Sequence, residues 1–300
     1  MKFRRVQFLG VLLLVALTLV HPACAQDAAA RAASRHSLWK VEGTNNTVYL
    51  LGSIHLLKED NYPLPAPIEA AFSNSLIAVF EADVSRMQQP ESQLKLMTKA
   101  RLPAGETLKS QLSSETYARF EEHLKKLELP EMVLAQLKPS LAAITLAMLE
   151  LQKMGFDPAH GVDQHFYNRA RQDGKTTGAL ESVDFQIDLL TNFTKEEGEL
   201  LMKTTLKDIE NTQKMYDEIV QAWKTGDVDA MEKLINEALR EAPAIARRLL
   251  TDRNHNWVPK IREMLKGGKP AIVIVGAGHL VGPEGVVALL RQQGLKVTQL

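Results

Sequence analysis

The sequence is poor in cysteine. The 300-residue chain contains one, Cys24, which lies close to the N-terminus. A single cysteine cannot form an internal disulfide, and it cannot provide the several thiolates of a structural zinc site. If the N-terminal segment is removed, as inferred below, the remaining chain has no thiol nucleophile either. Histidine, carboxylate and hydroxyl side chains are therefore the candidates for any chemistry.

The chain also has no net charge, no nucleotide-binding motif and few aromatic residues. The 36 basic and 36 acidic side chains cancel. Without the basic residues Lys2, Arg4 and Arg5, the chain after residue 25 carries 33 basic against 36 acidic groups, so we expect no nucleic-acid partner. The glycine-rich motifs of phosphate-binding loops are absent, which gives no support to nucleotide binding. Aromatic residues make up only 6%, which weighs slightly against a large flat ligand.

The first 25 residues have the order of a cleavable signal peptide. Basic residues come first, an apolar run follows over residues 8–20, and the segment ends with Ala-Cys-Ala. The run is too short for a membrane-spanning helix, and the pattern predicts cleavage after Ala25. We therefore expect a periplasmic or secreted protein with no transmembrane span after signal removal. Lipidation of Cys24 and an uncleaved anchor are the less favoured alternatives.

Beyond a flexible leader expected at 26–37, apolar stretches typical of buried strands lie near both ends of the chain. The middle, roughly 85–175 and 195–266, has helical character. We predict one domain over 38–300 of class α/β (or α+β), with a mixed β-sheet built from both ends and a large helical middle as an insertion. The expected strands are Leu38–Gly43, Val48–Leu51, Ile77–Phe80, Lys175–Leu180, Ala271–Val275 and Lys296–Gln299.

Three of these strands are followed by residues suited to chemistry. The second strand leads into Gly-Ser-Ile-His, which ends at His55, the fifth into Gly-Ala-Gly-His, which ends at His279, and the third into Glu81. Ligands bind beyond the carboxyl ends of parallel strands, so we expect these side chains to converge if the strands are parallel neighbours. Gly52 and Gly276 open the two motifs, where a missing side chain permits a sharp turn or the close approach of a ligand.

Residues of these types leave the chemistry open. Two imidazoles and a carboxylate are suited to hold a divalent ion with a free position for water. The same groups also work without a metal, when a histidine transfers protons and a carboxylate orients it. A third alternative is that both histidines are structural. Glu181, which follows the fourth expected strand, is a further candidate.

Other polar residues have competing interpretations. Asp163 is expected chiefly as the N-cap of the helix that follows it. Arg253 is suited equally to a structural ion pair and to binding a substrate carboxylate. Ser53 is not favoured as a nucleophile because the Gly-x-Ser-x-Gly elbow pattern is absent. His255 is expected at the surface.

The two Gly-x-x-His motifs, with Glu81 between them, resemble the TraB/GumN family. That family is similar to the Tiki proteases and, more distantly, to erythromycin esterase-like and ChaN-like proteins. The resemblance covers most of the chain from about residue 38 to 300, and its looser middle part includes Glu181, Arg253 and Asn254. It implies an active site formed by His55, His279 and Glu81, with Gly52, Gly276, Glu181, Arg253 and Asn254 as second-tier residues.

The leading hypothesis is an exported metal-dependent hydrolase, most like a peptidase, because the Tiki-like relatives are metal-dependent peptidases. His55 and His279 would hold zinc, manganese or cobalt, and Glu81 would be a ligand or the general base for the bound water. The expected substrate is a peptide or a small ester or amide. Two rivals remain: a metal-free His/Glu esterase-like hydrolase, and a periplasmic accessory protein that binds haem, a metal or a polysaccharide-assembly partner. The sequence does not indicate an oligomeric state.

Overall fold

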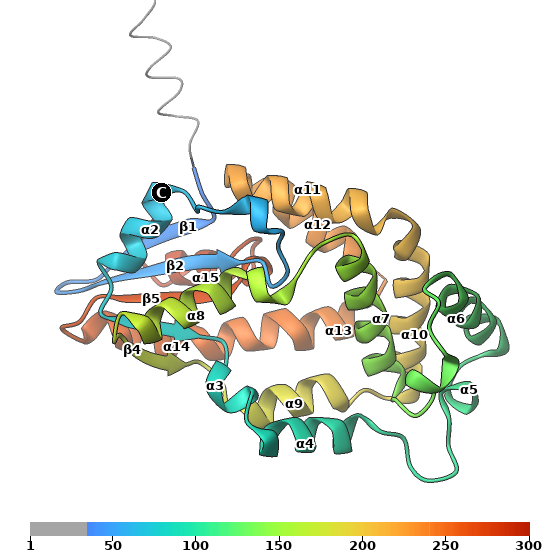
Figure 1. Ribbon diagram of the computed structural model, residues 1–300. Coiled ribbons are helices and arrows are strands. Elements are labelled where there is room, and N and C mark those ends of the chain that lie inside the picture. The colour runs from blue at the N-terminus through green and yellow to red at the C-terminus, as the bar shows by residue number, and fades with distance from the viewer. Residues whose placement is uncertain (1–34, 240) are drawn as a thin grey trace, which may run out of the picture. The chain divides into compact units, whose positions relative to one another are not determined.

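The computed structural model describes residues 35–239 and 241–300. The predicted signal peptide, Cys24 and most of the predicted leader lie outside this part. Six strands form one sheet (Figure 1), with the order β4-β3-β5-β2-β1-β6. The strands are β1 (Leu38–Glu42), β2 (Thr47–Ser53), β3 (Ile77–Phe80), β4 (Thr176–Ala179), β5 (Ala271–Gly276) and β6 (Lys296–Gln299). The predicted mixed sheet, built from both ends of the chain around a helical middle, is confirmed.

Four neighbouring strands run parallel: β4, β3, β5 and β2. β1 is antiparallel to β2 and to β6. β5 lies at the centre, and its residues 271–275 are at most 1% exposed, which explains their continuous apolar sequence. Ser53 of β2 pairs with Gly276 of β5, and Phe80 of β3 pairs with Ile274. The segments that follow these three strands therefore leave the sheet on the same side, at the carboxyl ends of its parallel strands.

The described part begins before the predicted boundary of the domain. His36 and Ser37, which the sequence places in the leader, are buried. The N–H of His36 donates to the carbonyl of Leu300 at 2.6 Å, and the hydroxyl of Ser37 donates to the carbonyl of Trp223 at 3.2 Å. The last residues of the predicted leader are thus packed parts of the domain.

The helices surround the sheet and extend beyond it (Figure 1). Gly226 ends α11 before α12 begins, Pro243 opens α13, and a π-helical turn at Arg247–Thr251 joins α13 to α14. The helices are α2 (Ala66–Ser73), α3 (Val84–Met87), α4 (Pro90–Ala100), α5 (Leu108–Gln111), α6 (Ser114–Lys126), α7 (Pro139–Lys153), α8 (Val162–Gln172), α9 (Val183–Thr191), α10 (Lys195–Asp208), α11 (Thr212–Thr225), α12 (Val228–Leu239), α13 (Pro243–Ala246), α14 (Asp252–Lys266) and α15 (Val286–Gln292).

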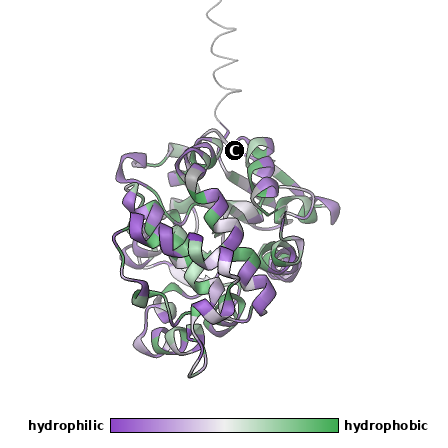
Figure 2. Ribbon diagram, turned by 90° about the vertical axis from the view of Figure 1, so that its right-hand side faces the viewer, coloured by the Kyte–Doolittle hydropathy of each residue, from purple (hydrophilic) through white to green (hydrophobic). Residues whose placement is uncertain are grey.

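Two hydrophobic cores stabilise the domain. The larger one lies on the sheet and the helices that cover it, and a smaller one is formed among α5, α6, α7 and α10. α6 shows the pattern that builds the smaller core, because its buried residues Tyr117, Phe120 and Leu124 lie on one helical face. Figure 2 shows hydrophilic and hydrophobic stretches alternating along the helices, as expected where one face is buried. Within the described ranges, we find no helix with the length and apolar character needed to cross a bilayer.

Candidate active site

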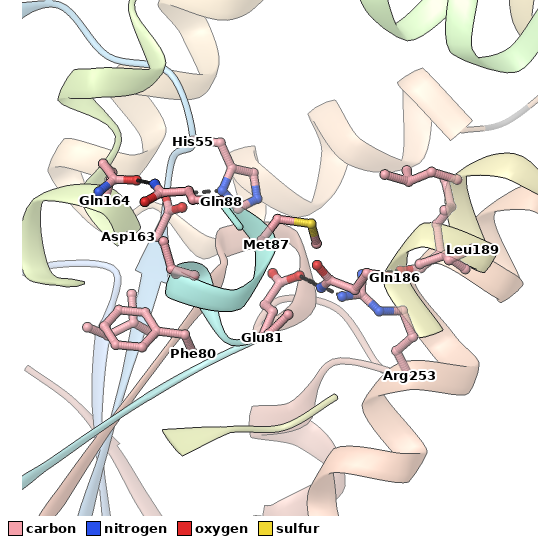
Figure 3. A pocket seen from close by; sticks show the side chains of 15 residues that line it. His55, Phe80, Glu81, Met87, Gln88, Asp163, Gln164, Gln186, Leu189 and Arg253 are labelled. Carbon is pink, nitrogen blue, oxygen red and sulfur yellow. Dashed lines mark hydrogen bonds and ion pairs between the residues drawn. The ribbon is translucent and has the colours of Figure 1, made fainter. Parts of the chain in front are cut away.

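A cavity of about 470 Å³ lies at the carboxyl edge of the parallel strands. Its polar lining includes His55 after β2, Glu81 after β3 and Arg253 from α14, and Figure 3 shows Glu81 between the other two. Asp163, from the first turn of α8, lies beside His55 (Figure 3). The apolar part of the lining includes Phe80, Val84, Met87, Leu189, Leu190 and Leu249.

Gly276 is the point at which the three leading candidates meet. A Cβ atom at this position would stand 3.3 Å from Glu81 Oε1, 3.4 Å from His55 Nε2 and 3.5 Å from His279 Cδ2. The backbone N–H of Gly276 also donates to Glu81 Oε1 at 2.8 Å. The structure thus brings together the side chains that the strand ends suggested, and the absent side chain of Gly276 leaves them room.

His55 is held by Asp163 and keeps one ring nitrogen open to the pocket. Its Nδ1 lies 3.1 Å from Asp163 Oδ1, and the hydroxyl of Ser53 donates to the same oxygen at 2.8 Å. The N–H of Asp163 in turn donates to the Ser53 hydroxyl at 3.2 Å. The His55 side chain is 55% exposed, and its Nε2 makes no hydrogen bond to the described part of the chain.

The expectation that Asp163 caps its helix is wrong. The N-cap of α8 is Gly161, and no side chain caps the helix. A Cβ on Gly161 would stand 2.3 Å from the carbonyl oxygen of His55, and the N–H of Val162 donates to the carbonyl of Ile54. This close backbone contact brings the first turn of α8 against the Gly-x-x-His segment, so the carboxylate of Asp163 turns to His55 instead of the helix end.

His279 has the opposite environment, although it ends the same kind of motif. It is 4% exposed, and its Nδ1 lies 2.7 Å from Asn254 Oδ1. Asn254 Nδ2 donates to the carbonyl of Glu284 at 2.8 Å, which fixes the amide so that His279 Nδ1 must be the donor. Nε2 is then the acceptor, and Arg253 Nη1 donates to it at 3.0 Å. Both ring nitrogens of His279 are therefore engaged inside the protein.

Arg253 uses all five of its N–H groups within the site. Nε donates to both oxygens of Glu181, Nη1 to Leu249 and His279, and Nη2 to Glu181 and to Glu81 at 2.6 Å. No N–H remains for a substrate carboxylate in this arrangement. Of the two interpretations of Arg253, the geometry shows the structural ion pair.

Glu181 is a structural partner in the same network. Its side chain is 6% exposed, and the indole N–H of Trp257 donates to its Oε1 at 2.9 Å. It lies two residues after the end of β4 and precedes Ser182, whose hydroxyl caps α9 by accepting from the N–H of Phe185. The strand end and the cap together fix where Glu181 points. Gln186, one turn into α9, reaches back to both Glu181 and Glu81.

The electrostatics give the two histidines different protonation states. The Asp163 carboxylate, with a smaller contribution from Glu81, raises the pKa of His55 to about 9. Burial, together with the neighbouring Arg253 guanidinium, lowers the pKa of His279 to about 3. At neutral pH we therefore expect a protonated His55 and a neutral His279.

The two carboxylates nearest His55 are ionised. Burial by itself raises the pKa of Glu81, but the positive charges of His279 when protonated, Arg253 and His55, and the N–H of Gly276, outweigh it and lower the pKa to about 2. Burial likewise opposes ionisation of Asp163, and His55 and Ser53 lower its pKa. The pocket thus pairs a protonated imidazole with two carboxylates.

The donor atoms do not fit a metal ion as they stand. Among residues 35–239 and 241–300, no three histidine, cysteine, aspartate or glutamate side chains are placed to hold one. His279 has no free lone pair, because Nε2 accepts from Arg253, and the guanidinium also contacts Glu81. A metal held by His55, His279 and Glu81 requires Arg253 to withdraw, so the metal hypothesis stays a prediction.

Within the described part of the chain, the histidines other than His55 and His279 do not line this pocket. His165 stacks on Tyr62 with ring centroids 4.7 Å apart, and His255 is exposed and pairs with Glu284, as expected of a surface residue. The partnership of Asp163 with His55 was missed by sequence reasoning. The signal for it was the Gly-x-Asp sequence at the start of α8, but nothing local indicates which strand end that helix meets.

An α/β fold with a histidine-and-carboxylate site at the carboxyl edge of its sheet is thus established. The sequence matches the TraB/PrgY/gumN family over residues 37–299. The chain belongs to this family.

Two relatives show the same similarity. YbaP of Escherichia coli (strain K12) is 25% identical over 252 residues, which cover 82% of this chain and 89% of YbaP. YbaP of Shigella flexneri gives the same values. Both are described only as "Uncharacterized protein YbaP", so they support the family and assign no reaction. No solved structure matches the sequence.

Proposed function

We propose that the chain is a hydrolase that uses His55 and Asp163 as its proton-transfer pair and works without a bound metal ion. The contrast between the two histidines carries this proposal. His55 presents Nε2 to an open pocket and fixes Nδ1 on Asp163, whereas His279 uses both nitrogens inside the protein. A carboxylate that orients one ring nitrogen and leaves the other facing the substrate is typical of histidine acids and bases.

His55 and Glu81 then take complementary roles. The raised pKa of His55 keeps a proton on Nε2 at neutral pH, and this proton goes to the leaving atom of the substrate. Glu81 Oε1 accepts one N–H, from Gly276, and its second lone pair orients a water molecule. The water oxygen adds to the acyl carbon, Glu81 takes the water proton, and the bond to the leaving atom breaks as His55 protonates it.

A substrate in the cavity displaces water from Glu81. Burial raises the pKa of this carboxylate, whereas its charged neighbours Arg253 and His55 lower it, so Glu81 meets the water molecule as an ionised base. After release of the products, Glu81 returns its proton to solvent and His55 regains one, so the cycle closes without a cofactor.

The walls of the cavity favour an apolar group beside the bond that is cut. Val84 and Met87 of α3 and Leu189 of α9 belong to the apolar lining of the cavity. Gln88 and Gln164 also line it, and Gln88 Nε2 donates to Gln164 Oε1 at 3.2 Å. Amide side chains offer both donors and acceptors to a carbonyl or an amide. We infer that the substrate is a peptide or a small ester or amide with an apolar side chain.

Turnover of short peptides and p-nitrophenyl esters with apolar acyl groups tests the proposal, with and without a chelator. We expect His55→Gln to lose roughly 100-fold or more, and the chelator to have no effect. His255→Gln is the matched control and should keep its activity, because that histidine lies on the surface, paired with Glu284.

Three results would contradict the proposal. Retained turnover in His55→Gln would remove its role as the proton donor. Loss of turnover with a chelator, restored by zinc, manganese or cobalt, would support the metal-dependent peptidase instead. Binding of haem or a metal with no turnover of any substrate would favour the accessory protein.

A further inference from the structure

Three acceptors with little solvent exposure surround the guanidinium of Arg253. Glu81 Oε2 lies 2.6 Å from Nη2, Glu181 Oε2 lies 2.9 Å from Nη2, and His279 Nε2 lies 3.0 Å from Nη1. The three side chains are 15%, 6% and 5% exposed. They follow three different strands of the sheet, so the fold gathers them around one point. Two carboxylates and an imidazole are also a donor set that divalent transition metals accept.

Such a set cannot stay buried without a positive charge. Two ionised carboxylates taken out of water are strongly destabilised unless a cation compensates them. Arg253 supplies that cation from α14 and is held in turn by the carbonyl of Leu249, in the π-helical turn that precedes the helix. Because a guanidinium stays charged at every physiological pH, the compensation does not depend on an ion taken from solution.

We propose that Arg253 is the resident cation of this site, and that its guanidinium takes the charge-compensating place that a divalent metal ion would need among Glu81, Glu181 and His279. Within the described ranges these side chains do not stand at metal-binding positions, so they must close in on an ion once the guanidinium is removed. The inference rests on the metal-free form of the proposed function, since a metal bound here would replace that chemistry. It predicts an experimental result that the proposed function alone does not predict. Removal of the guanidinium leaves the three acceptors facing a vacated volume, and the variant should gain a metal site.

Co²⁺ is the probe, because its visible absorption reports coordination by protein side chains, and calorimetry gives the stoichiometry. We expect no saturable binding by the wild-type protein. Arg253→Ala should bind one equivalent of Co²⁺, with an affinity roughly 100-fold higher than any weak binding by the wild type. Arg253→Lys, which keeps a positive charge, should not gain the site. Arg262→Ala, an exposed arginine of the same helix, is the matched control and should behave as the wild type.

The donors are checked by a second substitution. Arg253→Ala combined with Glu181→Gln should lose the Co²⁺ absorption gained by the single variant. The wild-type protein and His279→Gln are compared in the same way. If the wild type binds one equivalent of Co²⁺ and His279→Gln does not, the inference is overturned, whatever the arginine variants show. Absence of binding in a folded Arg253→Ala would overturn it as well.

Arg253→Ala leaves two buried carboxylates without their partner, so its folding must be measured. If it is recovered unfolded, refolding in the presence and absence of Co²⁺ decides. Recovery that depends on the metal supports the inference, and equal failure in both contradicts it. None of these measurements uses turnover. Absence of hydrolysis by the wild type therefore counts against the proposed function alone, and Co²⁺ binding by the wild type counts against Arg253 as the resident cation.

Discussion

The buried, neutral state of His279 makes a prediction about stability that needs no substrate. Its pKa is lowered to about 3 in the folded protein, whereas an unfolded chain has the ordinary value near 6.5. Between these values the unfolded state binds a proton that the folded state does not. Stability therefore falls as the pH falls through 6.5, and it continues to fall toward 3.

The magnitude follows from the width of the chosen pH range. One pKa unit corresponds to about 1.4 kcal/mol, so His279 should cost about 2.5 kcal/mol of unfolding free energy between pH 7.5 and 4.5. The range stops at 4.5 because below it Glu81, whose pKa is lowered to about 2, begins to lose its own contribution. His279 is almost fully buried, so solvent screening does not reduce the figure much.

His279→Gln isolates this contribution. The glutamine amide offers an acceptor to Arg253 and a donor to Asn254, as the neutral imidazole does, but it does not titrate. Urea unfolding at pH 7.5 and 4.5 should show that the wild type loses about 2.5 kcal/mol more than the variant on acidification. His255→Gln, at an exposed position, should follow the wild type. Parallel losses in the wild type and His279→Gln would refute the assignment of a buried neutral imidazole.

Two further predictions concern the open side of the site. Asp163→Asn removes the charge that raises the pKa of His55, so NMR titration of the ring should give a midpoint moved down toward 6.5, by one unit or more. An unmoved midpoint would assign the shift to another group. Gly276→Ala places a methyl group 3.4 Å from His55 Nε2, so turnover of the substrates proposed above should fall more than roughly 10-fold, while urea unfolding changes by about 1 kcal/mol or less. Unchanged turnover would show that the space beside Gly276 is not used.

The fold was largely predictable because its strands are encoded locally. β5 is covered on both faces and reads as an unbroken apolar run, and the Gly-x-x-His motifs follow strands that were recognised on the same grounds. The convergence of His55, His279 and Glu81 then followed from the general position of sites in parallel sheets. This convergence depends on β2, β3 and β5 lying next to one another, and β5 pairs with both β2 and β3.

The different environments of the two histidines could not be predicted, since the same motif precedes both. His279 is buried because α14 packs over it with Asn254 and Trp257, whereas His55 stays open to the cavity. The partner of His55 lies 108 residues away in the sequence, and its approach depends on the close contact at Gly161. The hydrogen bonds that saturate Arg253 likewise come from four separate segments. Such features belong to the packing of helices on the sheet, which local patterns do not encode.

The order of the strands has a consequence for how the sheet is assembled. β5 joins β2 to β3, yet it follows every helix from α2 to α14 in the sequence. A chain that stops before β5 keeps the partners of the β1–β2 and β3–β4 pairings but has no strand to join them. It also lacks Gly276 and His279. Assembly of the sheet and of the site therefore depends on β5, so a chain truncated before this strand is not a smaller working version of the protein.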